Sequence, residues 1–249
     1  MKLLVDIGNS RVKWALLSAN ALLEQQAKSH NNNAAAICEW LFRQQKFSQI
    51  VLAHVLGDQF NREISEIAKQ HSINLLIVHS ELQAYGIETT YLQADKLGVD
   101  RFITMLAAHH LNTKRDCIVI DCGTATTIDA IDATGKHIGG VIFPGLQLCE
   151  DSLINKAKNL LKIKQELKDS ELNLLAKTTA QGVKTGCHYS LAATIDRICK
   201  EMEQVIVSQH AVKRIICGGN AKDIHTLLDG EYELNENLLM QGLQFIANK

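Results

Sequence analysis

Two stretches of the chain share one pattern: LLVDIGNSRVKWALL at residues 3–17 and IVIDCGTATTIDAI at residues 118–131. In each, an apolar strand leads into an aspartate, any residue, a glycine, a hydroxyl-bearing turn and a second strand. Asp6 and Asp121 are separated by close to half of the 249-residue chain. The repeat therefore predicts two similar domains that each contribute a β-hairpin to one cleft.

Runs rich in Val, Ile and Leu alternate with helical patterns along most of the chain, which predicts an α/β fold. The polar segment 112–116 precedes a new buried strand, so we place a boundary there, giving domains 1–113 and 114–249. In the first domain we expect strands at 2–7, 11–17, 21–28, 49–55 and 74–79, and helices at 33–46, 58–70 and 98–111. In the second we expect strands at 117–123, 125–131, 137–142 and 213–219, and helices after Pro144, at 178–207 and twice near the C-terminus.

The composition excludes several classes of protein. With 46% hydrophobic residues, the chain can bury a sizeable core and is not disordered. The net charge of -1 gives no electrostatic footprint for nucleic acid or an anionic membrane surface, and only 5% of the residues are aromatic. No uncharged apolar run is long enough to span a bilayer, and no signal peptide is recognisable. We therefore expect neither nucleic acid nor a membrane as a partner.

The seven cysteines are odd in number, include no CxxC pair and lie partly within apolar runs. Because this usage is typical of reduced proteins, we interpret them as structural thiols and expect a cytoplasmic location. His109 and His110 are adjacent on a predicted helix, so they cannot share one face as metal ligands do at i, i+4 spacing. We expect structural or surface roles for both histidines.

The glycine turns after the first strand of each repeat suit phosphate binding. Because glycine has no Cβ, successive backbone N–H groups can approach phosphate oxygens closely, and Ser10 or Thr124 adds a hydroxyl donor. A carboxylate beside bound phosphates would repel them, so each aspartate implies Mg²⁺, a monovalent cation or water in between. The alternative is a structural hairpin whose aspartate caps its own turn.

Two further glycine-rich segments follow predicted strands. GGVIFPG at 139–145 contains Pro144, the only proline of the chain, which fits a fixed turn or a helix start. IICGGNAKDI at 215–224 ends a strand in two glycines and opens a helix, which would let a flat base or ribose lie against the backbone. No GxxxxGK(S/T) or GxGxxG segment is present, which disfavours a P-loop or a Rossmann nucleotide site.

Taken together, five segments resemble the motifs of type III pantothenate kinases, in the family's order and at its spacing: DIGNSRVK (6–13), LGVDR (97–101), DCGTATTID (121–129), GGVIFPG (139–145) and CGGNA (217–221). These enzymes belong to the acetate and sugar kinase, Hsp70 and actin superfamily. The resemblance implies two ribonuclease H-like (actin-like ATPase) domains with a nucleotide cleft between them. It also implies ATP-dependent phosphorylation of pantothenate to 4'-phosphopantothenate, the first step of coenzyme A biosynthesis.

The resemblance also implies roles for individual residues. Asp100 is similar to the family's catalytic base, and Asp121 to its ligand for a monovalent cation, K⁺ or NH₄⁺, beside the Mg²⁺ that accompanies ATP. The implied ATP-binding residues are Asp6, Ile7, Gly8, Asn9, Ser10, Arg11, Val12, Lys13 and Thr124. The implied pantothenate-binding residues are Tyr91, Gly98, Val99, Asp100, Arg101 and Thr179. The family forms homodimers whose substrate site borrows residues from the partner subunit.

Two positions depart from the family pattern. Ala94 stands where proline is usual, which bears on the rigidity of the substrate loop. Lys177 and Thr178 stand where Arg-Asn is common, which bears on the contacts near Thr179. Neither departure removes a reacting group.

Residue chemistry alone leaves other interpretations open for four of these side chains. Asp100 could serve only as a favourable charge at a helix N-terminus. Arg101 offers a planar fork for the carboxylate of pantothenate, but it could pair with Asp95 or with a neighbouring subunit. Lys13 could face a phosphate or solvent, and Tyr91 could be a core residue with a satisfied hydroxyl.

Two other functions compete with pantothenate phosphorylation. A kinase or phosphatase of the same superfamily could act on a sugar, acetate or polyphosphate, because paired hairpins bind phosphate without specifying the acceptor. LGVDR and Tyr91 argue against that alternative. A regulatory accessory factor is the non-enzyme alternative, since the family includes relatives named for effects on transcription. The near-neutral charge and the intact Asp6, Asp100 and Asp121 weigh against it.

Overall fold

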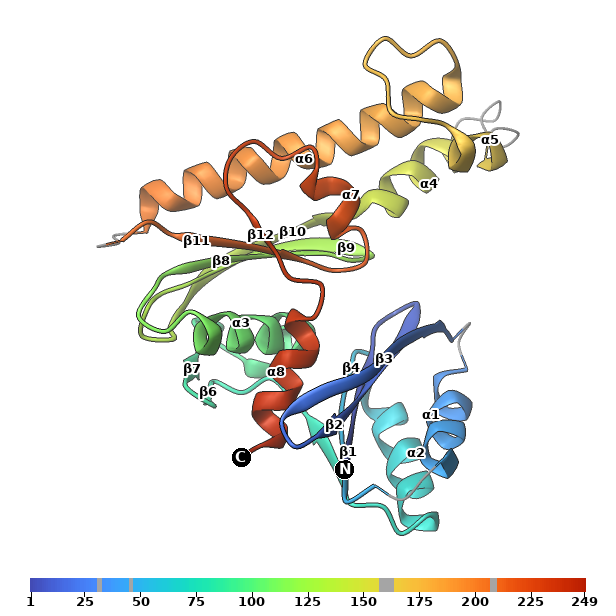
Figure 1. Cartoon of the computed structure of the whole chain (residues 1–249), viewed down its shortest axis with the longest axis vertical. Helices are drawn as coiled ribbons and strands as arrows, with labels where there is room; N and C mark the ends of the chain where they lie inside the picture. Colours follow the sequence, from blue (N-terminus) through green and yellow to red (C-terminus); the bar gives the residue numbers. More distant parts are fainter. Residues whose placement is uncertain (31–32, 45–46, 157–163, 207–209) are drawn as a thin grey trace. The chain divides into compact units, whose positions relative to one another are not determined.

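The computed structural model describes residues 1–30, 33–44, 47–156, 164–206 and 210–249 (Figure 1). Contacts within the chain define two compact units. The first comprises Met1–Thr113, Thr134–His137 and Asn237–Lys249, and the second comprises Lys114–Ala133 and Ile138–Glu236. The division into domains 1–113 and 114–249 stays a prediction. It assigns the C-terminal residues to the second domain, whereas Asn237–Lys249 pack with the first unit.

The first unit is built on a five-stranded sheet of order β3-β2-β1-β4-β5. Its strands are β1 (Lys2–Ile7), β2 (Arg11–Ser18), β3 (Ala21–Ser29), β4 (Gln49–His54) and β5 (Leu75–Val78). The first three strands pair antiparallel, and β4 and β5 run parallel to β1. The helices are α1 (Ala34–Gln44), α2 (Gly57–Gln70), α3 (Val99–Leu111) and α8 (Leu238–Ala247). Three short elements precede α3: β6 (Gln83–Ala84), β7 (Ile87–Glu88) and the 3-10 turn η1 (Ala94–Lys96).

Different helices cover the two faces of this sheet (Figure 1). Leu3, Val5 and Ile7 belong to an apolar cluster with residues of α1 and α2. Because successive residues of a strand point to opposite faces, Leu4 and Asp6 point the other way. On that side α8 packs against β1 and β4, and α3 packs against β4 and α8. Asp6 therefore faces the helix layer that contains α3.

The C-terminal helix α8 lies close against α3. Gly242 permits this approach, because a Cβ added there would lie 2.4 Å from the carbonyl oxygen of Ile103. The ring of His110 packs on Phe245 of α8, with centroids 4.9 Å apart. Its Nε2 also bonds to the Tyr85 carbonyl at 2.7 Å. His110 thus has the structural role that the sequence predicts.

The second unit repeats the plan with a five-stranded sheet of order β10-β9-β8-β11-β12. Its strands are β8 (Cys117–Cys122), β9 (Ala125–Ile131), β10 (His137–Pro144, with His137 in the first unit), β11 (Lys213–Cys217) and β12 (Glu233–Leu234). Its helices are α4 (Leu146–Lys156), α5 (Lys164–Asp169), α6 (Thr179–Val205) and α7 (Ala221–His225). The core contains Ile118 and Ile120 of β8, Ile128 of β9, and Leu191 and Ile195 of α6.

The two sheets have the same order when their strands are numbered from the start of each unit. In both, the first two strands form an antiparallel hairpin, and the fourth strand runs parallel beside the first. This arrangement confirms the predicted α/β repeat. The helices expected at 33–46 and 178–207 are α1 and α6, although residues 45, 46 and 207 lie outside the described part of the chain. The patterns missed α5, β12 and the β6–β7 pair, which are all short.

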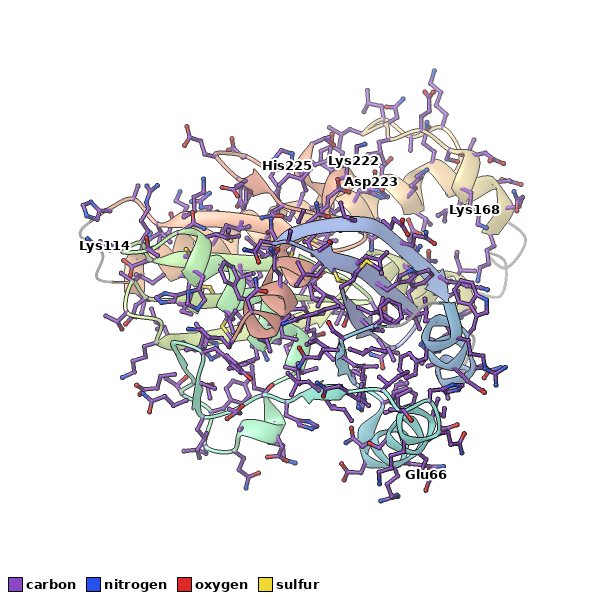
Figure 2. The ribbon with its side chains drawn as sticks, turned by 60° about the horizontal axis from the view of Figure 1, so that its bottom comes forward. Glu66, Lys114, Lys168, Lys222, Asp223 and His225 are labelled. Carbon is purple, nitrogen blue, oxygen red and sulfur yellow. The ribbon has the colours of Figure 1, made fainter. Side chains whose placement is uncertain are left out.

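Charged side chains of both signs point outwards from the helices (Figure 2). Glu66 on α2 and Lys168 on α5 are both exposed, as are the adjacent Lys222 and Asp223 on α7. The alternation of sign agrees with the near-zero net charge of the chain. None of the described helices has both the length and the apolar character needed to cross a membrane.

Candidate active site

The first repeat places Asp6 next to Lys13 on one face of the sheet. The two residues lie directly opposite each other in the β1–β2 register, and residues opposed in this way have neighbouring side chains on the same face. Asp6 is only 5% exposed, and Lys13 is half-buried. Lys13 therefore shares the Asp6 face, which α3 and α8 cover.

The turn between β1 and β2 is stabilised by hydrogen bonds from His30, the residue that follows β3. Gly8 N–H donates to the carbonyl of Arg11 at 3.0 Å, which closes the turn. The carbonyl of Gly8 accepts a hydrogen bond from Nε2 of His30 at 3.0 Å, and the carbonyl of Ser10 accepts one from the His30 N–H at 3.2 Å. Because the C=O and N–H of one trans peptide point in opposite directions, the Asn9 N–H faces away from His30. The turn therefore exposes a donor where an anion can approach.

His54, at the end of β4, adds no positive charge to this edge of the sheet. Its Nδ1 accepts a hydrogen bond from the Leu56 N–H at 3.2 Å, so its Nε2 carries the hydrogen that is donated to Asn61 Oδ1 at 2.7 Å. Burial is the main cause that lowers the pKa of His54 below its usual value. The ring is neutral at neutral pH, whereas Lys13 brings a positive charge to the face of the sheet that carries Asp6.

Asp100 lies at the N-terminus of α3. Its Oδ1 accepts the Arg101 N–H at 2.8 Å. A Cβ at Gly98, the N-cap residue, would lie 2.6 Å from this oxygen, so glycine is needed for this carboxylate position. Ser80 Oγ, just past β5, donates to the Leu97 carbonyl at 2.8 Å. Since β1 and β5 both run parallel to β4, their carboxyl ends lie at the same end of the sheet. That end carries both Asp6 and the start of α3.

Tyr91 and Arg101 form a pair near this helix start. Arg101 is 4% exposed and donates from Nη1 to the Tyr91 hydroxyl at 2.8 Å. Its guanidinium carbon lies 5.5 Å from the centroid of the Tyr91 ring. Asp95, which the sequence offers as an alternative partner for Arg101, instead forms an exposed ion pair with Lys96 at 2.9 Å.

Sequence reasoning missed three polar residues that support these groups. His30 bonds to the first turn, and Thr89 and His137 contact Tyr91. No local sequence pattern identifies these residues, because folding brings each of them to a partner that is distant in the sequence or set by strand pairing. Thr89 and His137, for example, are 48 residues apart in the sequence.

In the second unit, three predicted glycine-rich segments meet at the turn after β8. Gly123 N–H donates to the Ala125 carbonyl at 3.1 Å, which closes the turn. Gly145 N–H donates to the Thr124 carbonyl at 3.1 Å, and Asn220 N–H donates to the Cys122 carbonyl at 3.0 Å. The segments 121–124, 139–145 and 217–221 therefore come together, although they are far apart in the sequence.

Close backbone approach explains two of these glycines. A Cβ at Gly145 would lie 2.3 Å from the Gly123 carbonyl oxygen. A Cβ at Gly218, where φ is +97°, would lie 2.3 Å from Oδ1 of Asp121. The absent side chain of Gly218 thus makes room for the Asp121 carboxylate. Of the two glycines at 218 and 219, only Gly219 has no atom within 4 Å of an added Cβ and so leaves space of the kind expected for a flat ligand.

Thr179 is the exposed first residue of α6. The preceding Thr178 caps the helix by accepting the Gln181 N–H at 3.1 Å, and Gln181 Oε1 accepts the Lys177 N–H at 2.9 Å. This reciprocal cap gives the Lys177-Thr178 departure a structural role.

A groove of about 930 Å³ runs beside Thr179 between α4 and α6, and Pro144, Leu148, Leu153 and Cys187 are among its lining residues. Burial is the largest cause that raises the pKa of the Cys187 thiol to about 11. That thiol is therefore protonated at neutral pH, as expected of a structural cysteine.

Comparison with known proteins identifies the family. A family model described as type III pantothenate kinase matches residues 2–201. The type III pantothenate kinase of Nitrosococcus oceani is 31% identical over 99% of this chain and 94% of its own length. That of Herminiimonas arsenicoxydans is 33% identical over 99% of this chain and 97% of its own length. The chain belongs to the type III pantothenate kinase family.

Two solved structures show the fold of this kinase. MreB 5 of Spiroplasma citri, bound to AMPPNP, has a TM-score of 0.56 at 11% identity over 99% of this chain and 96% of its own. The activator of 2-hydroxyisocaproyl-CoA dehydratase from Clostridium difficile, with bound ADPNP, has a TM-score of 0.54 at 12% identity over 99% and 93%. The predicted actin-like ATPase fold is confirmed. As a member of its family, the protein is a kinase that phosphorylates pantothenate, the first step of coenzyme A biosynthesis.

Proposed function

We propose that Asp100 is the catalytic base with which this kinase transfers the γ-phosphoryl group of ATP to the primary hydroxyl of pantothenate. The observation that carries the proposal is that Asp100 at the start of α3 and Asp6 near the end of β1 lie at the same end of the sheet. In phosphoryl transfer the protein mainly positions the acceptor and stabilises charge. The Arg101 N–H holds Oδ1 of Asp100 and so orients Oδ2, the atom that we assign to the substrate hydroxyl.

The Asp100→Asn variant tests this role. It keeps the side-chain shape and removes the proton acceptor, so we expect turnover to fall by about 10² to 10⁴-fold while ATP still binds. If Asp100 were only a favourable helix charge, stability would change by about 0.3 to 1 kcal/mol and turnover would persist. Measuring the formation of 4'-phosphopantothenate by mass spectrometry distinguishes these outcomes. A screen of other alcohols in the same assay tests the acceptor, and phosphorylation of another alcohol with pantothenate inert would refute the proposal.

The first turn, residues 6–13, and Thr124 of the second turn are the proposed ATP-binding groups. The outward-facing Asn9 N–H, the exposed Ser10 and the neighbouring Lys13 support phosphate binding at the first turn. Asp6 would hold the Mg²⁺ that accompanies ATP, and the ion would offset the repulsion between this carboxylate and the phosphates. The guanidinium of Arg101 is suited to bind the carboxylate of pantothenate. The proposed pantothenate-binding residues are Tyr91, Gly98, Val99, Asp100, Arg101 and Thr179.

Asp121 is the proposed ligand of a monovalent cation, K⁺ or NH₄⁺. Among the described residues, no three His, Cys, Asp or Glu side chains gather into a metal site. A single carboxylate in a turn of closely packed backbone carbonyls fits a weakly hydrated monovalent ion, whose shell carbonyl oxygens can replace. Bound there, the ion would supply positive charge near the phosphates. We expect higher rates in K⁺ or NH₄⁺ than in Na⁺ alone, and equal rates would refute the assignment.

The kinase is further proposed to act as a homodimer in the cytoplasm. The apolar groove between α4 and α6, with Thr179 on its border and Leu148 and Leu153 half-exposed, supports a subunit contact in the second unit. Sedimentation that gives a monomer at micromolar concentration would refute the dimer. All seven cysteines are thiols rather than disulfides, which suits a reducing compartment. Exclusive recovery of the protein outside the cytoplasm would contradict that location.

A further inference from the structure

We propose that Thr89 and His137 are positioning residues that hold Tyr91 in place and so determine how tightly the kinase binds pantothenate. This inference rests on the proposed function, in which Tyr91 contacts that substrate. Neither Thr89 nor His137 belongs to the motifs that define the site. Both are polar and buried, with Thr89 at 8% exposure and His137 at 0%.

Thr89 connects the other two residues through one hydroxyl. Its Oγ1 accepts the backbone N–H of Tyr91 at 3.2 Å. The same oxygen lies 3.3 Å from Nδ1 of His137, within hydrogen-bond distance. Because buried polar groups are costly unless hydrogen-bonded, these bonds fix the backbone at Tyr91 to the imidazole of His137.

His137 also contacts the Tyr91 side chain directly. The two rings are stacked, with centroids 5.8 Å apart and an angle of 20° between their planes. The backbone of Tyr91 is therefore held by Thr89 and its ring by His137. An aromatic ring supported in this way has little freedom to change rotamer.

Backbone contacts of the neighbouring residues also fix the position of His137. The segment 134–137, which ends at His137, pairs with β7, where Glu88 N–H donates to the Gly135 carbonyl at 2.9 Å. At Gly135, φ is +92°, and a Cβ would lie 2.0 Å from the carbonyl oxygen of Gly86. Only glycine permits this approach, which brings His137 to Tyr91 within the first unit.

The hydroxyl of Tyr91 is oriented from its other end by Arg101. It accepts a hydrogen bond from Nη1 of Arg101 at 2.8 Å. A phenol that accepts in this way still has its own hydrogen to donate. Tyr91 therefore presents a donor to its ligand, and the matching group on pantothenate is a carbonyl or carboxylate oxygen. Thr89 and His137 would act by keeping that donor in position, without touching the substrate.

The first test is Thr89→Val in the full-length kinase. Valine keeps the shape and removes Oγ1, so we expect the KM for pantothenate to rise about tenfold, the size of one lost hydrogen bond. The KM for ATP should stay within about twofold of the wild-type value. Thr89→Ser keeps the hydroxyl and should restore the KM for pantothenate. Thr113→Val, at an exposed threonine, is the matched control and should change neither constant.

A double-mutant cycle distinguishes positioning from general packing. If Thr89 acts through Tyr91, Thr89→Val should have no further effect in a Tyr91→Ala background. His137→Phe keeps the stacked ring but loses Nδ1, and should raise the KM for pantothenate in the same way. If that variant does not fold, the Thr89 variants decide alone.

The outcomes separate the inference from the proposed function. An unchanged KM for pantothenate in Tyr91→Ala would remove Tyr91 from the substrate site, and the inference with it. If Tyr91→Ala raises that KM while Thr89→Val does not, the positioning inference alone is wrong. Equal increases in both KM values, together with a lower melting temperature, would show a merely structural role and would also overturn it.

Discussion

The turns at Gly8 and Gly123 have similar sequences, but they are supported in different ways. The Gly8 turn is held by the end of β3, through the ring of His30 and the backbone, and a Cβ at Gly8 would meet only the Arg11 carbonyl, at 3.9 Å. Around the Gly123 turn, by contrast, Cβ atoms at Gly145 and Gly218 would lie 2.3 Å from the Gly123 carbonyl and the Asp121 carboxylate. A shared sequence pattern thus specifies the hairpin but not the contacts that hold it.

The difference follows from what comes next along the chain. In the first unit β3 is long enough to run beside the turn, so Ser29 at its end and His30 just after it can donate to the turn carbonyls. In the second unit α4 begins directly after Gly145, and the chain leaves β11 through Gly218. Two chain segments therefore crowd the second turn, and only glycine backbones fit there. Changes at Gly145 and Gly218 should therefore mainly affect folding, whereas changes at Gly8 and His30 should mainly affect ATP binding.

The largest effect is expected from Gly218→Ala. The added methyl group would clash with the Asp121 carboxylate and the Cys122 backbone at a residue whose φ is +97°. Strain and overpacking together should lower the free energy of unfolding by about 2–4 kcal/mol, measured by denaturant titration. The neighbouring Gly219→Ala has open space and is the matched control, expected within about 0.5 kcal/mol of the wild type. Similar losses in the two variants would show that the crowding at Gly218 is not the cause.

The main strands, the α/β repeat and the helix expected at 98–111, which is α3, are predictable from sequence because periodicity and turn residues encode them locally. Asp6, Asp100 and Asp121 stay predicted site residues, which short motifs at strand or helix ends indicate. His30, Thr89 and His137 were not, because their partners are set by strand pairing and by the 134–137 segment. The return of α8 to the first unit was also unpredictable, since an amphipathic helix does not specify which layer it will cover.

An intermediate effect, specific to ATP, is expected from His30→Phe. Phenylalanine keeps a ring at this 4%-exposed position but cannot donate to the Gly8 carbonyl. Without that bond the Gly8–Asn9 peptide can rotate, so we expect the KM for ATP to rise about tenfold. His30→Gln can still donate an N–H and should recover part of the loss. Steady-state kinetics with each substrate varied in turn is the measurement, and a rise in the KM for pantothenate instead would contradict the role of the turn in phosphate binding.

Gly8→Ala should have the smallest effect on stability. The φ of Gly8 lies outside the left-handed region and an added Cβ has room, so alanine is compatible with the fold. Since alanine also restricts the unfolded chain, the free energy of unfolding should stay unchanged or rise by up to about 1 kcal/mol. The methyl group would nevertheless occupy space that we assign to phosphate, and the KM for ATP should increase. If Gly8→Ala instead destabilised the protein as much as Gly218→Ala, the two turns would be supported alike, and the contrast between a turn held by β3 and a turn packed between glycines would be wrong.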